Sequence, residues 1–237
     1  AVGVWMLGIR ALVVTLISVA SAVAAEWLYS LVTKTRNTVV DGSAMVTGLL
    51  LAMTLPASVP YWQVVLGSFF AIVFVKCLCG GLGQNIFNPA LAARALMLLI
   101  YPVGLTRYQG LDGVTAATPL HHMVMPALPE ESLGQMFMGN IGGCIGEVCT
   151  LALLIGGAYL LYKGVISFRI PAAYLGTVAV LTLVFSKGDN AILWMLYSLL
   201  GGGVVLGALF MAADYATSPA TPKGQIIYGI GCGVLTV

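Results

Sequence analysis

Charged residues are scarce in this chain. Its 237 residues include 10 Lys and Arg and 8 Asp and Glu, so that 8% are charged and 60% are hydrophobic. Soluble globular domains carry about 25% charged residues, and this composition therefore excludes that class. It also provides no basic surface for nucleic acid, and we expect no nucleic-acid partner. The sequence predicts an integral membrane protein whose surroundings are the lipid bilayer.

Cysteine is also sparse, and its spacing does not suit a metal site. Cys77 and Cys79 are two apart, Cys144 and Cys149 are five apart, and Cys232 stands alone. Zinc and iron–sulfur sites generally need two well-spaced pairs, so we predict no metal site and expect these residues to be small buried hydrophobes. The chain also lacks a dinucleotide fingerprint that follows a strand, which argues against an NAD(H) site in this chain.

Apolar runs of about 20 residues, the length needed to cross a bilayer, occur several times along the chain. The clearest predicted spans are 11–32, 61–79, 139–162, 170–186 and 191–213. Two shorter apolar segments, 43–55 and 87–101, are bounded by Gly, Asn and Pro and are predicted to be short or broken membrane helices. The fold class is therefore an all-α, polytopic membrane helix bundle with broken helices.

The distribution of basic residues predicts the orientation. Lys34 and Arg36 lie in one connection and Lys163 and Arg169 in another, whereas the segment 102–138 has one arginine against three carboxylates. Because loops rich in Lys and Arg stay on the cytoplasmic side, the first two connections are predicted to be inside and the segment 102–138 outside. The chain begins with Ala rather than Met and ends within an apolar stretch, and we expect the natural protein to be longer at both ends.

The long outer segment contains a polar turn of small residues, Asp-Gly-Val-Thr-Ala-Ala-Thr-Pro-Leu at 112–120. The small neighbours leave the hydroxyl of Thr118 with little steric cover. The stretch is similar to the acceptor motif on which flavin mononucleotide (FMN) is esterified to threonine through its phosphate. The other readings of these residues are an ordinary Asp-Gly turn and a helix cap. The predicted cofactor-binding residues of this segment are Asp112, Gly113, Thr115, Ala117 and Thr118.

A threonine hydroxyl is a poor nucleophile without a base beside it. The nearby candidates are Asp112, His121 and His122, and self-attachment is not expected. A separate flavin transferase would be needed, and the two histidines are expected to hydrogen-bond near the flavin.

Polar residues at the ends of two other apolar segments are further candidates. Three glycines, at 80, 81 and 83, permit positive φ or close backbone approach. Asn85 and Asn88 offer amide groups to a flavin ring or to a helix end, and we favour helix capping for Asn88, with Pro89 in the first turn of the helix. Arg94 is the preferred phosphate or flavin neighbour. The candidates at the second segment end are Asp214, Thr217 and Ser218, which could line a flavin pocket or a cation path.

Charged groups inside spans are costly, and therefore Glu26, Lys76 and Glu147 require partners. For Lys76 and Glu26 we expect the side chains to extend towards the membrane surface instead.

The order of elements hints at an internal repeat. The same order of features occurs twice: an apolar half-span, a break that contains proline, and a renewed span. The first copy is 48–56 followed by 61–75, and the second is 207–213 followed by 224–237. The alternative is that glycine-rich membrane helices all look alike. Broken helices in repeats bring backbone groups to the bilayer interior of transporters. We treat 1–237 as one transmembrane domain, with repeat one near 1–101, the outer loop at 102–138 and an incomplete repeat two at 139–237.

Taken together, the stretches 41–52, 80–90, 112–120 and 214–219 resemble one family over nearly the whole chain. That family is RnfD, a membrane component of the Rnf electron-transport complex, with its relative NqrB, a component of the sodium-translocating NADH:quinone reductase. The resemblance implies FMN on Thr118, although Thr115 stands where Ser is common and Ala116 where Gly is usual. It also implies two inverted repeats similar to urea and ammonium channels.

The resemblance further implies a function in a prokaryotic inner membrane. The chain would serve an oxidoreductase that passes electrons between reduced ferredoxin and NAD⁺ and moves Na⁺ or H⁺. Its partners would be the A, B, C, E and G components of the Rnf complex, and a second, noncovalent flavin such as riboflavin would be bound by analogy. The alternatives are a channel or transporter of the urea or ammonium type and a cofactor-free scaffold protein.

Overall fold

The computed structural model describes residues 2–34, 38–106, 108–109, 115–116, 132–139, 142–187, 190–201 and 203–237. These residues are helical apart from connections and one two-residue antiparallel pair, an architecture consistent with a helical membrane protein. The elements are α1 (Val2–Leu7), α2 (Ile9–Thr33), the 3-10 helix η1 (Val39–Asp41), α3 (Ser43–Thr54), α4 (Tyr61–Phe70), the π-helix η2 (Ala71–Cys77), α5 (Pro89–Ile100), α6 (Pro102–Thr106), β1 (Tyr108–Gln109), β2 (Thr115–Ala116), α8 (Leu133–Met138), α9 (Thr150–Tyr162), α10 (Arg169–Val184), α11 (Ala191–Leu200), α12 (Val204–Leu206), the π-helix η3 (Gly207–Met211) and α13 (Pro222–Thr236).

Helix lengths differ from the predicted spans. Among the described residues, only α2 is by itself long and apolar enough to cross a bilayer. The predicted span 191–213 is bent by 61° between α11 and α12, and the two parts qualify only when they are taken together. The other apolar helices, including α3, α5, α9 and α10, are shorter, because glycine, proline and polar turns interrupt the apolar runs.

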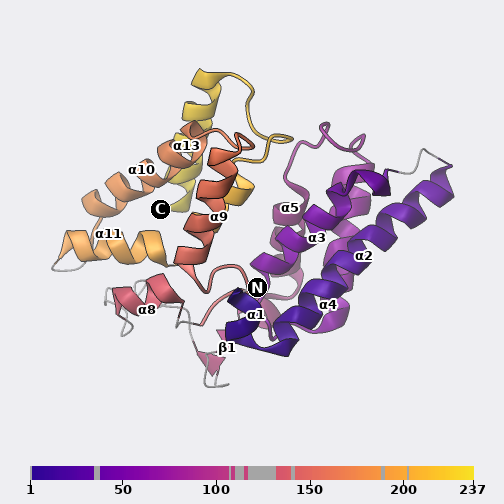
Figure 1. Cartoon of the computed structure of the whole chain (residues 1–237), viewed down its shortest axis with the longest axis horizontal. Helices are drawn as coiled ribbons and strands as arrows, with labels where there is room; N and C mark the ends of the chain where they lie inside the picture. Colours follow the sequence, from indigo (N-terminus) through magenta and orange to yellow (C-terminus); the bar gives the residue numbers. More distant parts are fainter. Residues whose placement is uncertain are drawn as a thin grey trace.

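The helices form two groups that lie side by side in Figure 1, α2 to α5 in one and α9 to α13 in the other. Small residues let the helices of each group approach closely. In the first group, a side chain at Gly48 of α3 would meet the Ser18 carbonyl of α2 at 2.8 Å. In the second, a side chain at Gly233 of α13 would meet the Cβ of Thr177 in α10 at 2.6 Å.

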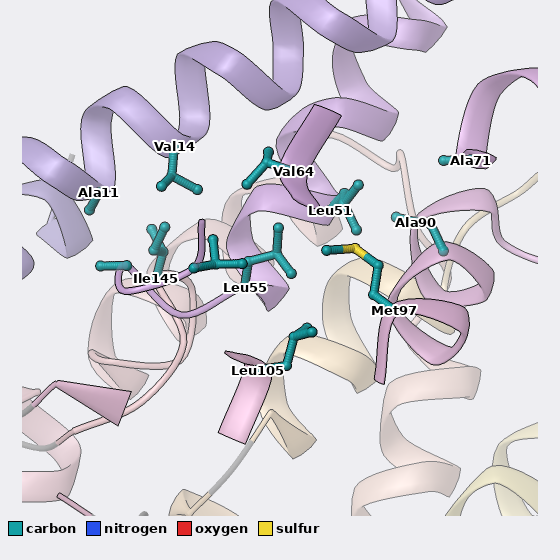
Figure 2. Close-up of a cluster of buried hydrophobic side chains, with 13 residues drawn as sticks. Ala11, Val14, Leu51, Leu55, Val64, Ala71, Ala90, Met97, Leu105 and Ile145 are labelled. Carbon is teal, nitrogen blue, oxygen red and sulfur yellow. The ribbon is translucent and has the colours of Figure 1, made fainter. Parts of the chain in front are cut away.

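The largest buried hydrophobic cluster of the described residues lies in the first group, and a smaller one lies in the second. Figure 2 shows the buried side chains of the largest cluster, with Val14 from α2, Leu51 from α3, Val64 from α4 and Met97 from α5 pointing toward a common centre. Ile145, from the chain segment that precedes α9, joins the same cluster. The segment before α9 therefore contributes to the core of the first group.

An irregular segment joins the two groups. The amide of Ile145 donates to the Leu55 carbonyl at 3.0 Å, and that of Gly146 donates to the Met53 carbonyl at 2.8 Å. Carbonyls in the last turn of a helix lack partners within the helix, and these two bonds satisfy groups at the end of α3. The prediction of a continuous span over 139–162 is wrong, since helix α9 begins only at Thr150.

Two π-helices occupy comparable places in the two groups. Helix α4 continues into η2 and then into a polar loop that leads to Pro89 at the start of α5. Helix α12 continues into η3 and then into a polar loop that leads to Pro222 at the start of α13. In this order of elements η3 corresponds to η2. The repeat predicted from the sequence instead matches 207–213 with 48–56, most of which belongs to α3.

Candidate functional site

Two cavities of about 410 Å³ each lie between the two helix groups. We call the first the asparagine cavity; its walls include Ser43, Lys76, Asn85, Asn88 and Asp214. We call the second the arginine cavity; its walls include Thr54, Arg94, Glu147, Tyr174, Tyr228 and Gly203. Both volumes fall in the range of about 300–1,000 Å³ that is usual for small-molecule and cofactor sites.

Asn85 and Asn88 reach the asparagine cavity from the loop before α5. Asn88 is the N-cap of this helix, where its side-chain oxygen accepts from the amides of Ala90 and Leu91, and the predicted capping with Pro89 in the first turn is confirmed. Asn85 is only 8% exposed, and its side-chain oxygen has no hydrogen-bond partner in the described part of the chain. A buried acceptor without a partner is costly, so a ligand with an N–H or O–H group fits this position.

The glycine-rich loop before these asparagines has the predicted backbone. Gly80, Gly81 and Gly83 have φ angles of 110°, 93° and 86°, a region that disfavours residues with a side chain. The loop turns back on itself there, which delivers Asn85 to the cavity wall.

Asp214 reaches the same cavity from the second group, after η3. Its carboxylate accepts from the amide of Ala216 at 3.2 Å and from the Thr217 hydroxyl at 3.4 Å, and its carbonyl accepts from the amide of Ser218 at 3.0 Å. Of the three residues predicted here, Asp214 lines the cavity, whereas Thr217 and Ser218 hold the turn that places it.

The prediction that Lys76 and Glu26 extend towards the surface is wrong. Lys76 is 2% exposed and Glu26 is 1% exposed, and the Lys76 ammonium lies 2.7 Å from the Glu26 carboxylate. The ammonium also donates to the Ser43 hydroxyl at 2.5 Å, and Lys76 and Ser43 both line the asparagine cavity. Sequence reasoning missed these two as site residues; the available signal was a single lysine inside an apolar run.

Asp41 completes this polar group at the start of α3. It accepts from the amide of Ser43 at 2.8 Å and from the hydroxyl of the same residue. Partial burial opposes ionisation of Asp41, but the hydrogen bonds from Ser43 and the charge of Lys76 outweigh it and lower the pKa of this carboxyl. Asp41 is therefore charged at neutral pH and keeps the Ser43 hydroxyl proton directed away from Lys76.

The arginine cavity contains the predicted flavin neighbour Arg94. Its guanidinium donates to the Cys144 sulfur at 3.5 Å, and no carboxylate oxygen of the described residues lies within 4.0 Å of it. Glu147 lines the same cavity, but at a longer distance from Arg94 than an ion pair requires. A half-buried guanidinium without a paired carboxylate suits an anionic ligand group.

Tyr108 lies beside Arg94 of the arginine cavity and pairs with the predicted acceptor segment. Burial raises the pKa of the Tyr108 phenol to about 12, against the lowering effect of Arg94 beside it. Tyr108 therefore stays a neutral hydroxyl, and it is paired in β1 with Ala116 of β2, as Gln109 is with Thr115. The other predicted residues of the segment, Asp112, Gly113, Ala117 and Thr118, lie outside the described residues, as do His121 and His122.

The two cavities share walls. In η3, Met211 lines the arginine cavity and Leu209 lines the asparagine cavity. In α5, Arg94 lines the first and Asn88, at the helix start, lines the second. Six residues of helix correspond to a rise of about 9 Å, so the cavities are roughly one to two helical turns apart.

The predicted role of the cysteines as buried hydrophobes holds for only part of the set. Cys144 is buried, Cys77, Cys149 and Cys232 are half-buried, and Cys79 is exposed. Cys79 lies just after η2, where the chain leaves the helix group, which explains its exposure.

A model of the NQR2, RnfD, RnfE family matches residues 1–237. The chain is 48% identical over 246 residues to the D component of the Na⁺-translocating ferredoxin:NAD⁺ oxidoreductase complex of Acetobacterium woodii, a match that covers 100% of this chain and 74% of that protein. It is 43% identical to the D component of the proton-translocating ferredoxin:NAD⁺ oxidoreductase complex of Clostridium ljungdahlii, with coverage of 99% and 75%. It is 37% identical to the D component of the ion-translocating oxidoreductase complex of Stutzerimonas stutzeri, with coverage of 98% and 76%.

Proposed function

Because the chain belongs to the NQR2, RnfD, RnfE family, we propose that it is the RnfD-type membrane component of an ion-translocating ferredoxin:NAD⁺ oxidoreductase complex. The observation that carries this proposal is the match over the whole chain, residues 1–237, together with relatives whose names give this activity. The complex passes electrons between reduced ferredoxin and NAD⁺ and moves an ion across the membrane. This chain supplies sites for electron carriers rather than the NAD⁺ site.

The first carrier is FMN, esterified through its phosphate to Thr118. Its support is the acceptor motif at 112–120 and the pairing of Ala116 with Tyr108, whose phenol lies beside Arg94. Arg94 offers the cavity a half-buried cation for the anionic parts of the cofactor. A flavin accepts and donates one or two electrons, and the covalent link keeps it from diffusing away.

The second carrier is a noncovalent flavin, riboflavin, in the asparagine cavity. The free side-chain oxygen of Asn85 suits an N–H or O–H group of such a ligand, and Asp214 faces the cavity from the opposite group. The separation of about 9 Å along α5 supports electron transfer between the two sites. The chain holds the carriers apart with the walls formed by η3 and α5.

The surroundings follow from the same proposal. The protein lies in a prokaryotic inner membrane, with Lys163 and Arg169 inside and the flavin-bearing loop outside. The corresponding positions of η2 and η3 support two repeats related by inversion. The exposed apolar side chains of α2, which include Leu16, Leu31 and Val32, suit contact with lipid or with the A, B, C, E and G components of the complex. A flavin transferase completes the maturation.

The covalent carrier is tested on a denaturing gel of the purified protein. We expect a fluorescent flavin band that Thr118→Ala abolishes and that Thr115→Ala, a matched loss of a hydroxyl in the same segment, retains. A band that survives Thr118→Ala moves the attachment elsewhere. No band in the unmodified protein favours a solute channel or a cofactor-free scaffold. The coupling ion is then identified from the Na⁺ dependence of electron transfer in the purified complex.

A further inference from the structure

Lys76 has an unusual set of partners for a buried lysine. An ammonium group has three N–H donors. Two of them are used, one by the Glu26 carboxylate at 2.7 Å and one by the Ser43 hydroxyl at 2.5 Å. The third has no acceptor among the described residues, and Lys76 lies in the wall of the asparagine cavity. One donor is therefore left for whatever occupies that cavity.

The two partners of Lys76, Ser43 and Glu26, each make a further hydrogen bond to another residue. The Ser43 hydroxyl donates its hydrogen bond to the Asp41 carboxylate, so it can only accept from Lys76. The Glu26 oxygen that accepts from Lys76 also accepts from the Thr38 hydroxyl at 2.6 Å. Glu26 would thus keep one hydrogen bond if the ammonium moved away. Its other oxygen has no partner in the described structure, so this carboxylate is only partly compensated.

The backbone around Lys76 is also special. It lies in the π-helix η2, where the amide of Leu78 donates to the Val73 carbonyl and the amide of Gly81 donates to the Lys76 carbonyl, each at 3.0 Å and five residues back. Such wide turns are rare and occur frequently at functional sites. They change the direction in which the following side chains point, and here the turn places the ammonium between Glu26 and the cavity.

We propose that Lys76 is a charge-compensating residue for a ring that becomes anionic on reduction in the asparagine cavity. Its ammonium pairs with Glu26 while the ring is neutral and is shared with the ring once an electron has arrived. The electron comes from reduced ferredoxin through the complex. Lys76 keeps its proton, and no bond to it forms or breaks. This inference rests on the proposed noncovalent flavin and adds a residue that sets how easily that flavin is reduced.

The test uses the purified full chain, separated from the other components of the complex, with Thr118→Ala to remove the tethered flavin, so that the visible spectrum reports the dissociable one. Riboflavin is the probe, and its reduction is followed in a potentiometric titration. With Lys76→Met we expect the reduced form to bind at least tenfold less tightly relative to the oxidised form, a fall of about 59 mV for a one-electron step. With Glu26→Gln we expect a rise in potential, because Lys76 is no longer shared with a carboxylate.

A second measurement separates this role from a structural one. Lys76→Met leaves Glu26 buried without its cation, so the thermal unfolding midpoint of flavin-free protein should fall, whereas adding Glu26→Gln should restore it. The double variant should nevertheless keep the lowered potential of Lys76→Met. Restored stability with the potential of the unmodified protein would show a purely structural ion pair and overturn the inference.

The amount of released riboflavin distinguishes the absence of a second flavin from the absence of a role for Lys76. Acid precipitation releases noncovalent riboflavin into solution, where it is quantified. If the unmodified complex releases none, the second flavin is overturned and the role of Lys76 with it. If riboflavin is present and all four proteins show the same potential, the role of Lys76 alone is overturned.

Discussion

Two asparagines three positions apart differ at the level of single atoms. The side-chain oxygen of Asn88 accepts from two amides at the start of α5, whereas that of Asn85 has no partner in the described chain. The sequence predicts both as polar groups near a cofactor and favours capping for Asn88. The capping is confirmed because Asn before Pro is a strong helix-start signal. The free acceptor of Asn85 depends on which atoms surround it, which no local pattern encodes.

Because the two residues have these different roles, substitution of Asn88 should affect stability and substitution of Asn85 should affect ligand binding. Asn88→Ala should destabilise the protein by about 1 kcal/mol through loss of the cap, and Asn88→Asp should retain the stability. Asn85→Ala removes a buried unsatisfied group, so it should leave the unfolding midpoint unchanged or raise it, while it weakens riboflavin retention about tenfold. Thermal unfolding in detergent and released riboflavin measure the two effects. Equal riboflavin retention in Asn85→Ala and unmodified protein would contradict the ligand role of Asn85.

Helix α13 shows that glycines in one helix are not equivalent. Gly229 and Gly233 face α10, where added Cβ atoms would lie 2.8 Å from the Ala173 side chain and 2.6 Å from that of Thr177. Gly231, between them, has nothing within 4 Å of an added Cβ. The close contact of α10 and α13 therefore depends on one face of the helix, with glycines four residues apart.

A matched pair of substitutions tests this packing. Gly233→Ala should destabilise the protein by about 1–3 kcal/mol, because the new methyl overlaps Thr177 and lies 3.0 Å from the Tyr174 carbonyl. Gly231→Ala should be neutral or stabilise by up to about 1 kcal/mol, since alanine favours helix and meets no atom there. The comparison is made by unfolding in detergent. Similar losses for both variants would show that helix propensity, and not the contact with α10, sets the stability.

The elements that the sequence predicts well are those decided by local apolar runs. Helices α2, α3, α5 and α10 begin and end within two residues of the predicted segments. The late start of α9 is missed because the apolar residues before Thr150 pack and pair with α3 instead of forming helix. The ion pair of Lys76 and Glu26 joins residues fifty positions apart, and its existence depends on how α2 packs against η2.

The whole molecule is organised around a seam between two helix groups. The asparagine and arginine cavities both lie in that seam, with walls from each group. The segment before α9 is a direct backbone connection across it, since residues 144–146 pair with residues 53–56 at the end of α3. Irregular backbone inside a membrane protein persists where its polar groups are satisfied by protein. The geometry of both cavities should therefore depend on this backbone connection, which we call the joint between the two groups.

Gly146 is the point at which the joint can be tested. A Cβ there would lie 2.7 Å from the Met53 Cβ and 2.8 Å from the Met53 carbonyl, the acceptor of the Gly146 amide. Gly146→Ala should therefore separate the groups, lower the unfolding midpoint and reduce riboflavin retention, although Gly146 does not line the asparagine cavity. Gly143→Ala is the control, because its Cβ would meet only the Glu147 side chain at 3.8 Å, an ordinary contact. Riboflavin retention that is unchanged in Gly146→Ala, with a lowered midpoint, would mean that the cavity is set within the helix groups and not by the joint between them.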